Sequence, residues 1–247
     1  MKAIIIAAGS GKRISNDVKS IPKSLINVNN KPIINYQIEI LNKLGIKDII
    51  VITGKFREKF NIKNVSYIHD LEHEKHDILG SLMEARKFLK NDVLVLYSDI
   101  IFESKIIEQT LNSNSDISIA VDLDWGKNYV NRNDHPKSEA ENVLLDSNNK
   151  ILQIKKNIKN EKFLIGEFLG IIKLSNFGSK VFIEKYDEAI KKYNSIFQNA
   201  KSISKAYLTD MIQELIDCKV KVEPVFISGK WCEIDTLEDL KNAEKKF

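Results

Sequence analysis

The stretch that decides the fold is MKAIIIAAGSGKR, over residues 1–13. Its apolar part is rich in isoleucine and is bounded by glycine, which is typical of a buried parallel β-strand followed by a tight turn. The apolar run is too short for a signal peptide, and it passes directly into a charged loop. Because glycine lets backbone N–H groups approach an anion closely, the turn is a candidate phosphate-binding loop.

Two familiar phosphate-binding loops do not fit this segment. A P-loop requires G-x-x-x-x-G-K-[ST], but Ile6 and Arg13 occupy the two outer positions around Gly11-Lys12. A dinucleotide-binding fingerprint requires G-x-G-x-x-G, and Ile14 stands where the third glycine is needed. The glycines alone therefore leave a simple tight exit from the strand as an alternative.

Strand-like and helical patterns alternate through the first 120 residues. Short apolar runs predict strands over 48–53, 65–68, 92–97 and 116–121. Apolar residues at helical spacing predict helices over 32–44 and 78–89. This alternation indicates βαβ units and a mostly parallel sheet.

The pattern changes after Asp122. Residues 123–142 are polar, and a hairpin is expected between 143–145 and 151–154. We then expect a strand over 163–174, helices over 176–217 with a break near 198–204, a strand over 219–227 and a final helix capped by Thr236. The sequence predicts one α/β domain over residues 1–247, with a Rossmann-like mixed, mostly parallel sheet flanked by helices and a small inserted polar and β-hairpin lobe at about 123–160.

Composition narrows the class of protein. Hydrophobic residues make up 43% and charged residues 29% of the 247 residues, as in an ordinary globular protein. Two cysteines are too few for a disulfide framework, which favours a reducing, cytoplasmic location, and no apolar run is long enough to span a membrane. The net charge of +4 is spread through the chain, so it suits small phosphorylated anions and indicates no nucleic-acid partner.

Three further segments extend the pattern of the first loop. They are Pro22-Lys23-Ser24-Leu25, Tyr97-Ser98-Asp99 at a predicted strand end, and Trp231-Cys232-Glu233-Ile234-Asp235-Thr236 before the last helix. With A-A-G-x-G-x-R, these elements resemble the signature of the nucleotidyltransferases that activate sugar phosphates, phosphocholine and phosphonates. The resemblance covers residues 3–236 and implies the fold of the nucleotide-diphospho-sugar transferases.

The resemblance implies transfer of a nucleotidyl group from an NTP to a phosphate or phosphonate oxygen, with release of pyrophosphate. Because both substrates are anions, catalysis rests mainly on positioning and charge neutralisation. Arg13 and Lys23 are the expected catalytic cations, for the leaving pyrophosphate and the α-phosphate respectively. Asp99 and Asp235 are the expected Mg²⁺ ligands, since Mg²⁺ prefers oxygen donors; a helix cap or turn is the alternative role for either aspartate.

The resemblance also suggests where the nucleotide binds. The expected contacts are small residues and loop amides at Ala7, Ala8, Gly9, Ser10, Gly11 and Lys12. Gly80 and Ser81 resemble a second base-contacting segment, although close helix–sheet packing explains small residues there equally well.

The segment Pro22-Lys23-Ser24 departs from the P-K-P common in the sugar enzymes, and the polar lobe resembles cytidylyltransferases that act on phosphocholine or small phosphonates. The expected acceptor-binding residues are Trp125, Tyr129, Arg132, Lys155 and Glu167. Aromatic and acidic groups can hold an ammonium, and the basic groups can hold a phosphate. Alternatively, the two aromatic residues anchor the lobe, Glu167 is a strand-end carboxylate, and Lys156 takes the place of Lys155.

His69, His73 and His76 lie close together, but His73-Glu74-Lys75-His76 is one residue short of H-E-x-x-H. We expect an acidic loop there rather than a transition-metal site, and we expect Cys218 and Cys232 to be inert thiols. The predicted function is a Mg²⁺-dependent cytidylyltransferase that joins CMP from CTP to phosphocholine, aminoethyl- or hydroxyethylphosphonate or a similar acceptor, for a cell-surface polysaccharide, other glycoconjugate or lipid headgroup. The alternatives are a sugar-1-phosphate nucleotidyltransferase using UTP, dTTP or GTP, and an inactive nucleotide-sensing subunit; the oligomeric state stays open, a homodimer included.

Overall fold

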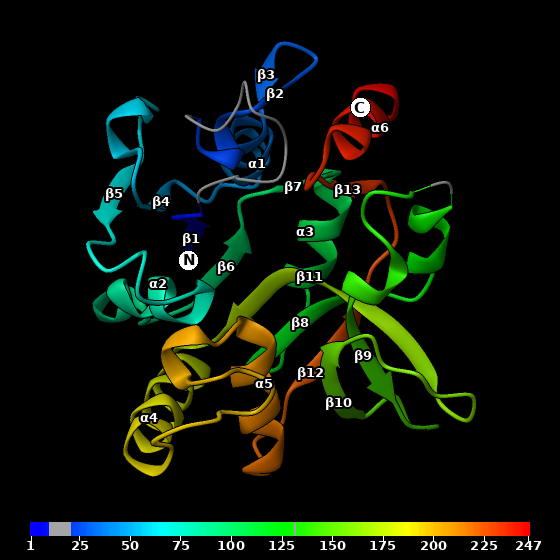
Figure 1. Ribbon diagram of the computed structural model, residues 1–247. Helices are drawn as coiled ribbons and strands as arrows, with labels where there is room; N and C mark the ends of the chain where they lie inside the picture. The colour runs from blue at the N-terminus through cyan, green and yellow to red at the C-terminus, as the bar shows by residue number, and fades with distance from the viewer. Residues whose placement is uncertain (10–20, 131) are drawn as a thin grey trace.

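The computed structural model describes residues 1–9, 21–130 and 132–247 (Figure 1). The first strand, β1 (Lys2–Ala7), lies within the main sheet, parallel to β4 (Asp48–Thr53) on one side and β6 (Val93–Tyr97) on the other. The edge strand β5 (Ser66–His69) pairs with β4, also in parallel. The predicted parallel sheet of the first half of the chain is therefore confirmed.

The long strand β11 (Leu164–Leu174) joins this parallel part to the rest of the sheet. It runs antiparallel to β6, to β8 (Ile117–Asp122) and to β9 (Glu141–Leu145). The hairpin partner β10 (Ile151–Lys156) pairs with β9, and β12 (Glu223–Phe226) lies parallel to β8. The sheet is thus mixed as predicted, and the inserted hairpin is continuous with it through β11.

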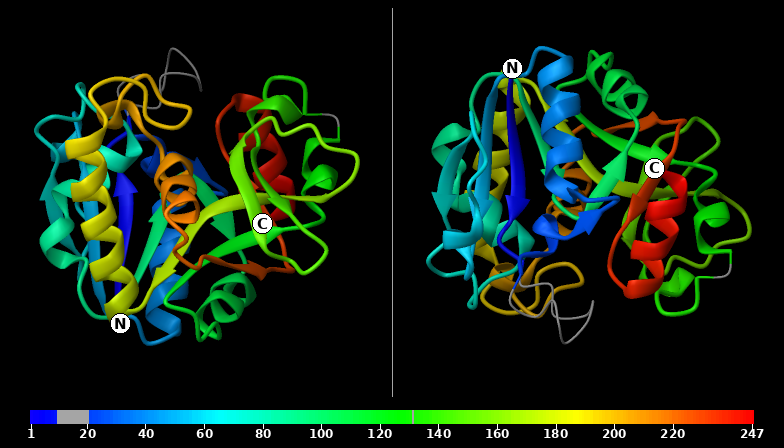
Figure 2. Two further views of the ribbon diagram at one scale, coloured as in Figure 1. Left: turned by 90° about the horizontal axis from the view of Figure 1, so that it is seen from below. Right: turned by 90° about the horizontal axis from the view of Figure 1, so that it is seen from above.

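Helices cover both faces of the sheet (Figure 2). One face packs against α1 (Ile33–Lys43) and α3 (Ser104–Leu111), and the other against α2 (Ile78–Glu84), α4 (Asn176–Lys192) and α5 (Leu208–Asp217). Neighbouring residues of β1 face opposite sides of the sheet. Ile5 packs in the core under α1 and α3, and Ile4 and Ile6 pack in the core under α2, α4 and α5. A continuous run of isoleucine is required because both faces of this strand are buried.

A smaller layer lies beside the main sheet. It contains α6 (Leu237–Lys246), the strand pair β7 (Ile100–Phe102) and β13 (Trp231–Glu233), and the pair β2 (Asn27–Val28) and β3 (Lys31–Pro32). Short 3₁₀ helices complete the described chain: η1 (Lys23–Leu25), η2 (Arg57–Lys59), η3 (Arg86–Phe88), η4 (Trp125–Tyr129), η5 (Lys137–Glu139) and η6 (Ile203–Lys205). The predicted cap of the last helix is confirmed, since Thr236 and Asp239 form a capping box.

Several predicted boundaries were wrong. The helix expected over 78–89 ends at Glu84 and continues only as a 3₁₀ turn, and the strand expected over 219–227 is limited to Glu223–Phe226. The break expected near 198–204 is wider, because α4 ends at Lys192 and α5 begins at Leu208. The sequence analysis did not predict α3, β7 or β13.

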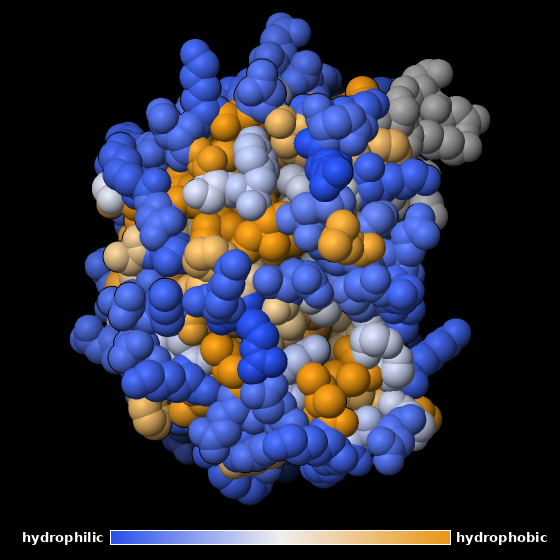
Figure 3. Space-filling model, turned by 90° about the vertical axis from the view of Figure 1, so that its left-hand side faces the viewer, coloured by the Kyte–Doolittle hydropathy of each residue, from blue (hydrophilic) through white to orange (hydrophobic). Residues whose placement is uncertain are grey.

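The surface beside β5 shows scattered apolar residues among hydrophilic ones (Figure 3). Tyr67 on this edge strand and Leu71 just after it are exposed. Across the described part of the chain, we find no helix with the length and apolar character that a membrane span requires.

Gly170 is a position where the fold requires glycine. Its φ is +69°, and a Cβ built on it would lie 2.2 Å from Cδ2 of Tyr97. The change Gly170→Ala is therefore expected to lower the free energy of unfolding by about 3 kcal/mol, through backbone strain and overpacking together. Urea denaturation measures this, with Gly126→Ala as the control, because the nearest atom to a Cβ at Gly126 is 3.7 Å away. Equal stability of the two variants would show that Tyr97 moves aside without cost.

Candidate active site

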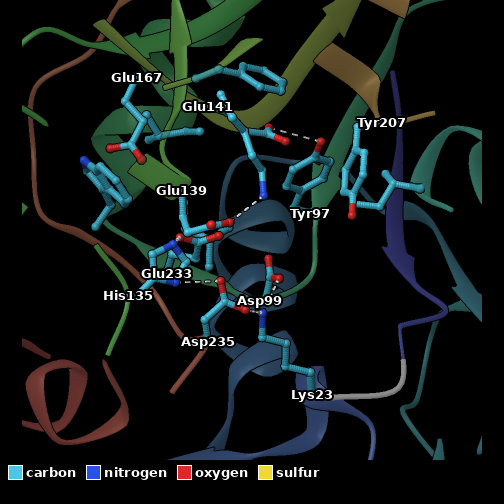
Figure 4. A pocket seen from close by; sticks show the side chains of 16 residues that line it. Lys23, Tyr97, Asp99, His135, Glu139, Glu141, Glu167, Tyr207, Glu233 and Asp235 are labelled. Atoms are coloured by element: carbon cyan, nitrogen blue, oxygen red, sulfur yellow. Dashed lines mark hydrogen bonds and ion pairs between the residues drawn. The ribbon is translucent and has the colours of Figure 1, made fainter. Parts of the chain in front are cut away.

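Two adjoining pockets lie at the carboxyl ends of β1 and β6, where open α/β sheets usually bind ligands. We call the pocket drawn in Figure 4 the inner pocket; it is lined by carboxylates, tyrosines and two lysines, including Glu141, Glu233 and Lys156. The outer pocket is lined by Ala8 and Gly9 after β1, by His73 and His76, and by Ser81 of α2. Lys23, Ile78, Tyr97 and Asp99 line both pockets.

Lys23 lies at the junction of the two pockets, between the two aspartates expected to bind metal. Its Nζ donates to Oδ2 of Asp99 at 2.7 Å and also to Oδ1 of Asp235. Burial alone would lower the pKa of Lys23, but the carboxylates of Asp99, Asp235 and Glu233 outweigh burial and raise the pKa above its ordinary value. The structure thus brings together three of the predicted residues, which lie 76 and 212 positions apart along the chain.

The aspartate pair has the chemistry of a magnesium site. Oxygens of both carboxylates contact one cationic nitrogen, so a single cation can be reached by both. Within the described residues, Oδ1 of Asp99 is buried without a hydrogen-bond partner. A buried carboxylate oxygen of this kind suits a hard divalent cation. Asp99 and Asp235 therefore fit Mg²⁺, and Glu233 and His135 lie beside them.

The rest of the inner pocket is strongly acidic. Burial raises the pKa of Glu141 to about 8, with Lys156 opposing this and Glu233 adding to it. Burial, then the charges of Asp235 and Asp99, raise the pKa of Glu233 to about 7. Lys156 donates to Glu139 at 3.0 Å, and Tyr97 donates to Glu141 at 3.3 Å (Figure 4). A bound cation would stabilise the charged form of these carboxyl groups.

Glu167 lines the inner pocket but is only 4% exposed. The hydroxyl of Tyr129 donates to its Oε1 at 2.5 Å, whereas its Oε2 is buried without a partner in the part of the chain that is described. Burial raises the pKa of Glu167 well above its usual range despite the hydrogen bond from Tyr129. The environment therefore favours the neutral acid, which differs from the ammonium-binding carboxylate that the sequence suggested.

The variant Glu167→Gln is expected to have nearly the wild-type free energy of unfolding. Its amide is neutral, like the protonated carboxyl group, and the amide oxygen can accept the hydrogen bond from the Tyr129 hydroxyl. By contrast, Glu167→Leu leaves the Tyr129 hydroxyl without an acceptor and is expected to cost about 1–3 kcal/mol. Urea denaturation of both variants at neutral pH measures the difference. If the glutamine variant loses as much stability as the leucine variant, Glu167 is held as an anion.

Residues predicted to bind the nucleotide are only partly brought together. Ala7 ends β1 and is buried, and Ala8 and Gly9 line the outer pocket. Ser81 lines the same pocket, and its hydroxyl donates to Asp70 at 2.7 Å. Gly80 instead packs against His76, since a Cβ there would lie 2.5 Å from the His76 side chain. Ser10, Gly11, Lys12 and Arg13 lie outside the described residues.

The structure corrects the prediction that Arg132 binds the acceptor. The Arg132 side chain is 5% exposed, and its Nε donates to Asp239 at 2.5 Å. The guanidinium is therefore bound to the first turn of α6. Trp125 also lies outside the pocket lining; its Nε1 donates to the carbonyl of Ile165 at 3.0 Å. Tyr129 is buried against Glu167, so the two aromatic residues anchor the segment, as the alternative interpretation had it.

Lys155 and Lys156 both line a neighbouring groove with Lys201 and Lys205, but only Lys156 also lines the inner pocket. The structure therefore favours Lys156, the alternative, over Lys155 as the lysine that reaches this pocket. The sequence analysis assigned no role to Glu233 or His135. Glu233 stands two positions before Asp235 in an extended segment, so alternation could have found it, whereas His135 shows no comparable local signal.

This fold and site define a nucleotidyltransferase. The family model described as the MobA-like NTP transferase domain matches residues 3–147, and the chain belongs to this family of enzymes. The CTP:phosphoglutamine cytidylyltransferase of Campylobacter jejuni is 31% identical over 257 aligned positions, which cover 98% of each chain. The choline-phosphate cytidylyltransferase of Streptococcus pneumoniae is 35% identical over 108 positions, 42% of this chain and 47% of that one.

The fold is also that of solved structures. The CTP:phosphocholine cytidylyltransferase from Streptococcus pneumoniae superposes with a TM-score of 0.71 and 23% identity, over 99% of this chain and 97% of that one. At this identity the likeness concerns the fold, and it confirms the expected nucleotide-diphospho-sugar transferase architecture.

Proposed function

We propose that this protein is a cytidylyltransferase that transfers CMP from CTP to a small phosphorylated acceptor carrying a positively charged amine, with release of pyrophosphate. The observation that carries the proposal is the inner pocket. It adds the carboxyl groups of Glu139, Glu141 and Glu233 to the aspartate pair, with Lys156 as a further cation in the lining. Such an acidic pocket favours a cationic head group over a neutral sugar.

The relatives support the choice of nucleotide and acceptor. CTP stands in the names of the Campylobacter jejuni enzyme and of the solved Streptococcus pneumoniae structure, and the acceptors named for the relatives, phosphoglutamine and choline phosphate, each contain a positively charged nitrogen. We therefore place phosphorylated amino acid amides and phosphocholine first and aminoethylphosphonate next, whereas hydroxyethylphosphonate, which has no amine, comes last. A role in assembling a cell-surface polysaccharide or lipid headgroup, and a homodimeric state, remain predictions.

The proposed reaction is an in-line displacement at the α-phosphorus of CTP. An oxygen of the acceptor phosphate forms a bond to this phosphorus as the bond to the bridging oxygen of pyrophosphate breaks, and pyrophosphate leaves with that electron pair. The outer pocket would hold the cytidine and the inner pocket the acceptor, so that the two meet at Lys23. Lys23 would neutralise charge at the α-phosphate, and Lys156 would contact the acceptor phosphate.

Mg²⁺ held by Asp99 and Asp235 would neutralise phosphate charge when bound. The loop amides of Gly9, Ser10, Gly11 and Lys12 would contact the β- and γ-phosphates, and Arg13 would stabilise the leaving pyrophosphate.

A substrate matrix tests this function. The protein is incubated with Mg²⁺, each of CTP, UTP, dTTP and GTP, and each acceptor: phosphocholine, a phosphorylated amino acid amide, the two phosphonates and a set of sugar 1-phosphates. Pyrophosphate release is expected with CTP and an amine-bearing acceptor. Turnover confined to another NTP and a sugar 1-phosphate would overturn the proposal. Tight NTP binding without any turnover would indicate a nucleotide-sensing subunit.

A further inference from the structure

His135 comes from the polar segment between η4 and η5 and lies beside the aspartate pair (Figure 4). The segment is clamped onto the first turn of α6. The backbone N–H groups of Asn133 and Asp134 donate to Oε2 of Glu238 at 2.7 and 2.9 Å, and Arg132 pairs with Asp239. His135 itself is 5% exposed, so its ring is held in one place by its surroundings.

The ring of His135 contacts the oxygen of Asp235 that faces away from Lys23. Its Nδ1 lies 3.0 Å from Oδ2 of Asp235, whereas Oδ1 of the same carboxylate accepts from Lys23. Its Nε2 lies 3.7 Å from Glu233. A carboxylate only accepts hydrogen bonds, so the network assigns the hydrogen to Nδ1.

We propose that His135 is a positioning residue for Asp235: its Nδ1–H holds Oδ2 and thereby turns Oδ1 toward Asp99, where both carboxylates can bind one divalent cation. The inference rests on the magnesium site of the proposed function. Loss of a hydrogen-bond partner that orients a metal-binding side chain typically lowers metal affinity about 10- to 100-fold. The polar insertion is thus coupled to the metal site through this ring.

Three substitutions separate orientation from packing. His135→Asn keeps an N–H donor near the position of Nδ1, His135→Gln places its amide near the position of Nε2, and His135→Leu removes both donors. Mn²⁺ affinity, measured by electron paramagnetic resonance with and without CTP, is expected to stay within about 3-fold for asparagine and to fall about 10- to 100-fold for glutamine and leucine. Lys127→Ala is the control, because it removes an exposed side chain of η4 that pairs with Asp124 and takes no part in the clamp.

Turnover and stability complete the test. Turnover of the glutamine and leucine variants is expected to be low at limiting Mg²⁺ and to recover as Mg²⁺ is raised. The thermal unfolding midpoints of all variants are compared in EDTA, which reveals any variant that merely folds poorly.

The inference is overturned if the leucine variant binds Mn²⁺ as tightly as the wild type, or if asparagine is as damaging as leucine. Nitrogen hyperfine coupling from His135 to Mn²⁺ would also overturn it, because the ring would then be a direct ligand. Since Mn²⁺ binding does not require transfer, failure of CTP or of the tested acceptors as substrates would sink the proposed function and leave this comparison intact.

Discussion

Replacing Asp99 by asparagine is expected to lower kcat about 1000-fold while the protein stays folded. The asparagine side chain can still accept the hydrogen bond from Lys23, but it loses the negative charge that would hold Mg²⁺. A bound metal supplies several kcal/mol of charge stabilisation at a phosphoryl group, and about 4 kcal/mol corresponds to a factor of about 1000 in rate. The measurement is pyrophosphate release at saturating CTP and acceptor, together with Mn²⁺ titration.

The matched control is Asp92→Asn, an exposed aspartate immediately before the other end of β6. It carries the same change of charge at a distance from the pockets, so its kcat and Mn²⁺ affinity are expected to match the wild type. An Asp99→Asn enzyme with wild-type turnover would remove Asp99 from the mechanism. Lost turnover with unchanged Mn²⁺ affinity would show that the carboxylate acts by another route.

Much of the parallel half of the fold could be predicted because its signals are local. An isoleucine run bounded by glycine indicates a strand with two buried faces, and β1 has both faces in a core. The position of Asp99 just after the end of β6 was predictable from the same local signal, whereas its metal-binding role was implied by the resemblance. The position of Asp235, by contrast, followed only from the resemblance, because nothing within residues 231–236 indicates that they return to the end of β6.

The errors arose where long-range pairing decides what a side chain does. Arg132 and Asp239 lie 107 positions apart, so the sequence near Arg132 gives no sign of this ion pair. An arginine in a polar segment is then easily predicted to bind a ligand. Trp125 is similar, since its partner is the carbonyl of Ile165. The strands β7 and β13 have three residues each, too few to show a period, and they form only by pairing with each other.

The Lys23→Met variant is expected to lose turnover and, at the same time, to bind divalent cations more tightly in the absence of nucleotide. The ammonium of Lys23 occupies the space between Asp99 and Asp235, so it and a metal ion compete for the same carboxylate oxygens. Methionine has a similar length without the charge. Removing the ammonium is therefore expected to raise Mn²⁺ affinity about 10-fold, which corresponds to about 1.4 kcal/mol of binding free energy.

Catalysis needs the same ammonium in its other role, at the α-phosphate. We expect kcat/KM of Lys23→Met to fall about 100- to 1000-fold, the usual effect of removing one preorganised electrostatic contact to a transition state. The apo variant is also expected to lose about 3 kcal/mol of stability, because two mostly buried carboxylates lose their shared partner. Since the pKa of Lys23 is raised above its ordinary value, the ammonium of the wild type stays protonated through the neutral range.

Added Mn²⁺ or Mg²⁺ should restore much of that stability, because the metal replaces the missing cation between the two aspartates. Thermal unfolding with and without metal measures this, and the metal-induced rise in midpoint is expected to be larger for Lys23→Met than for the wild type. Lys31→Met serves as the control, since Lys31 pairs with the exposed Glu39 on the surface. If Lys23→Met binds Mn²⁺ no more tightly than the wild type, the lysine and the metal do not share a site, and Lys23 would have to act on the phosphates from its present position.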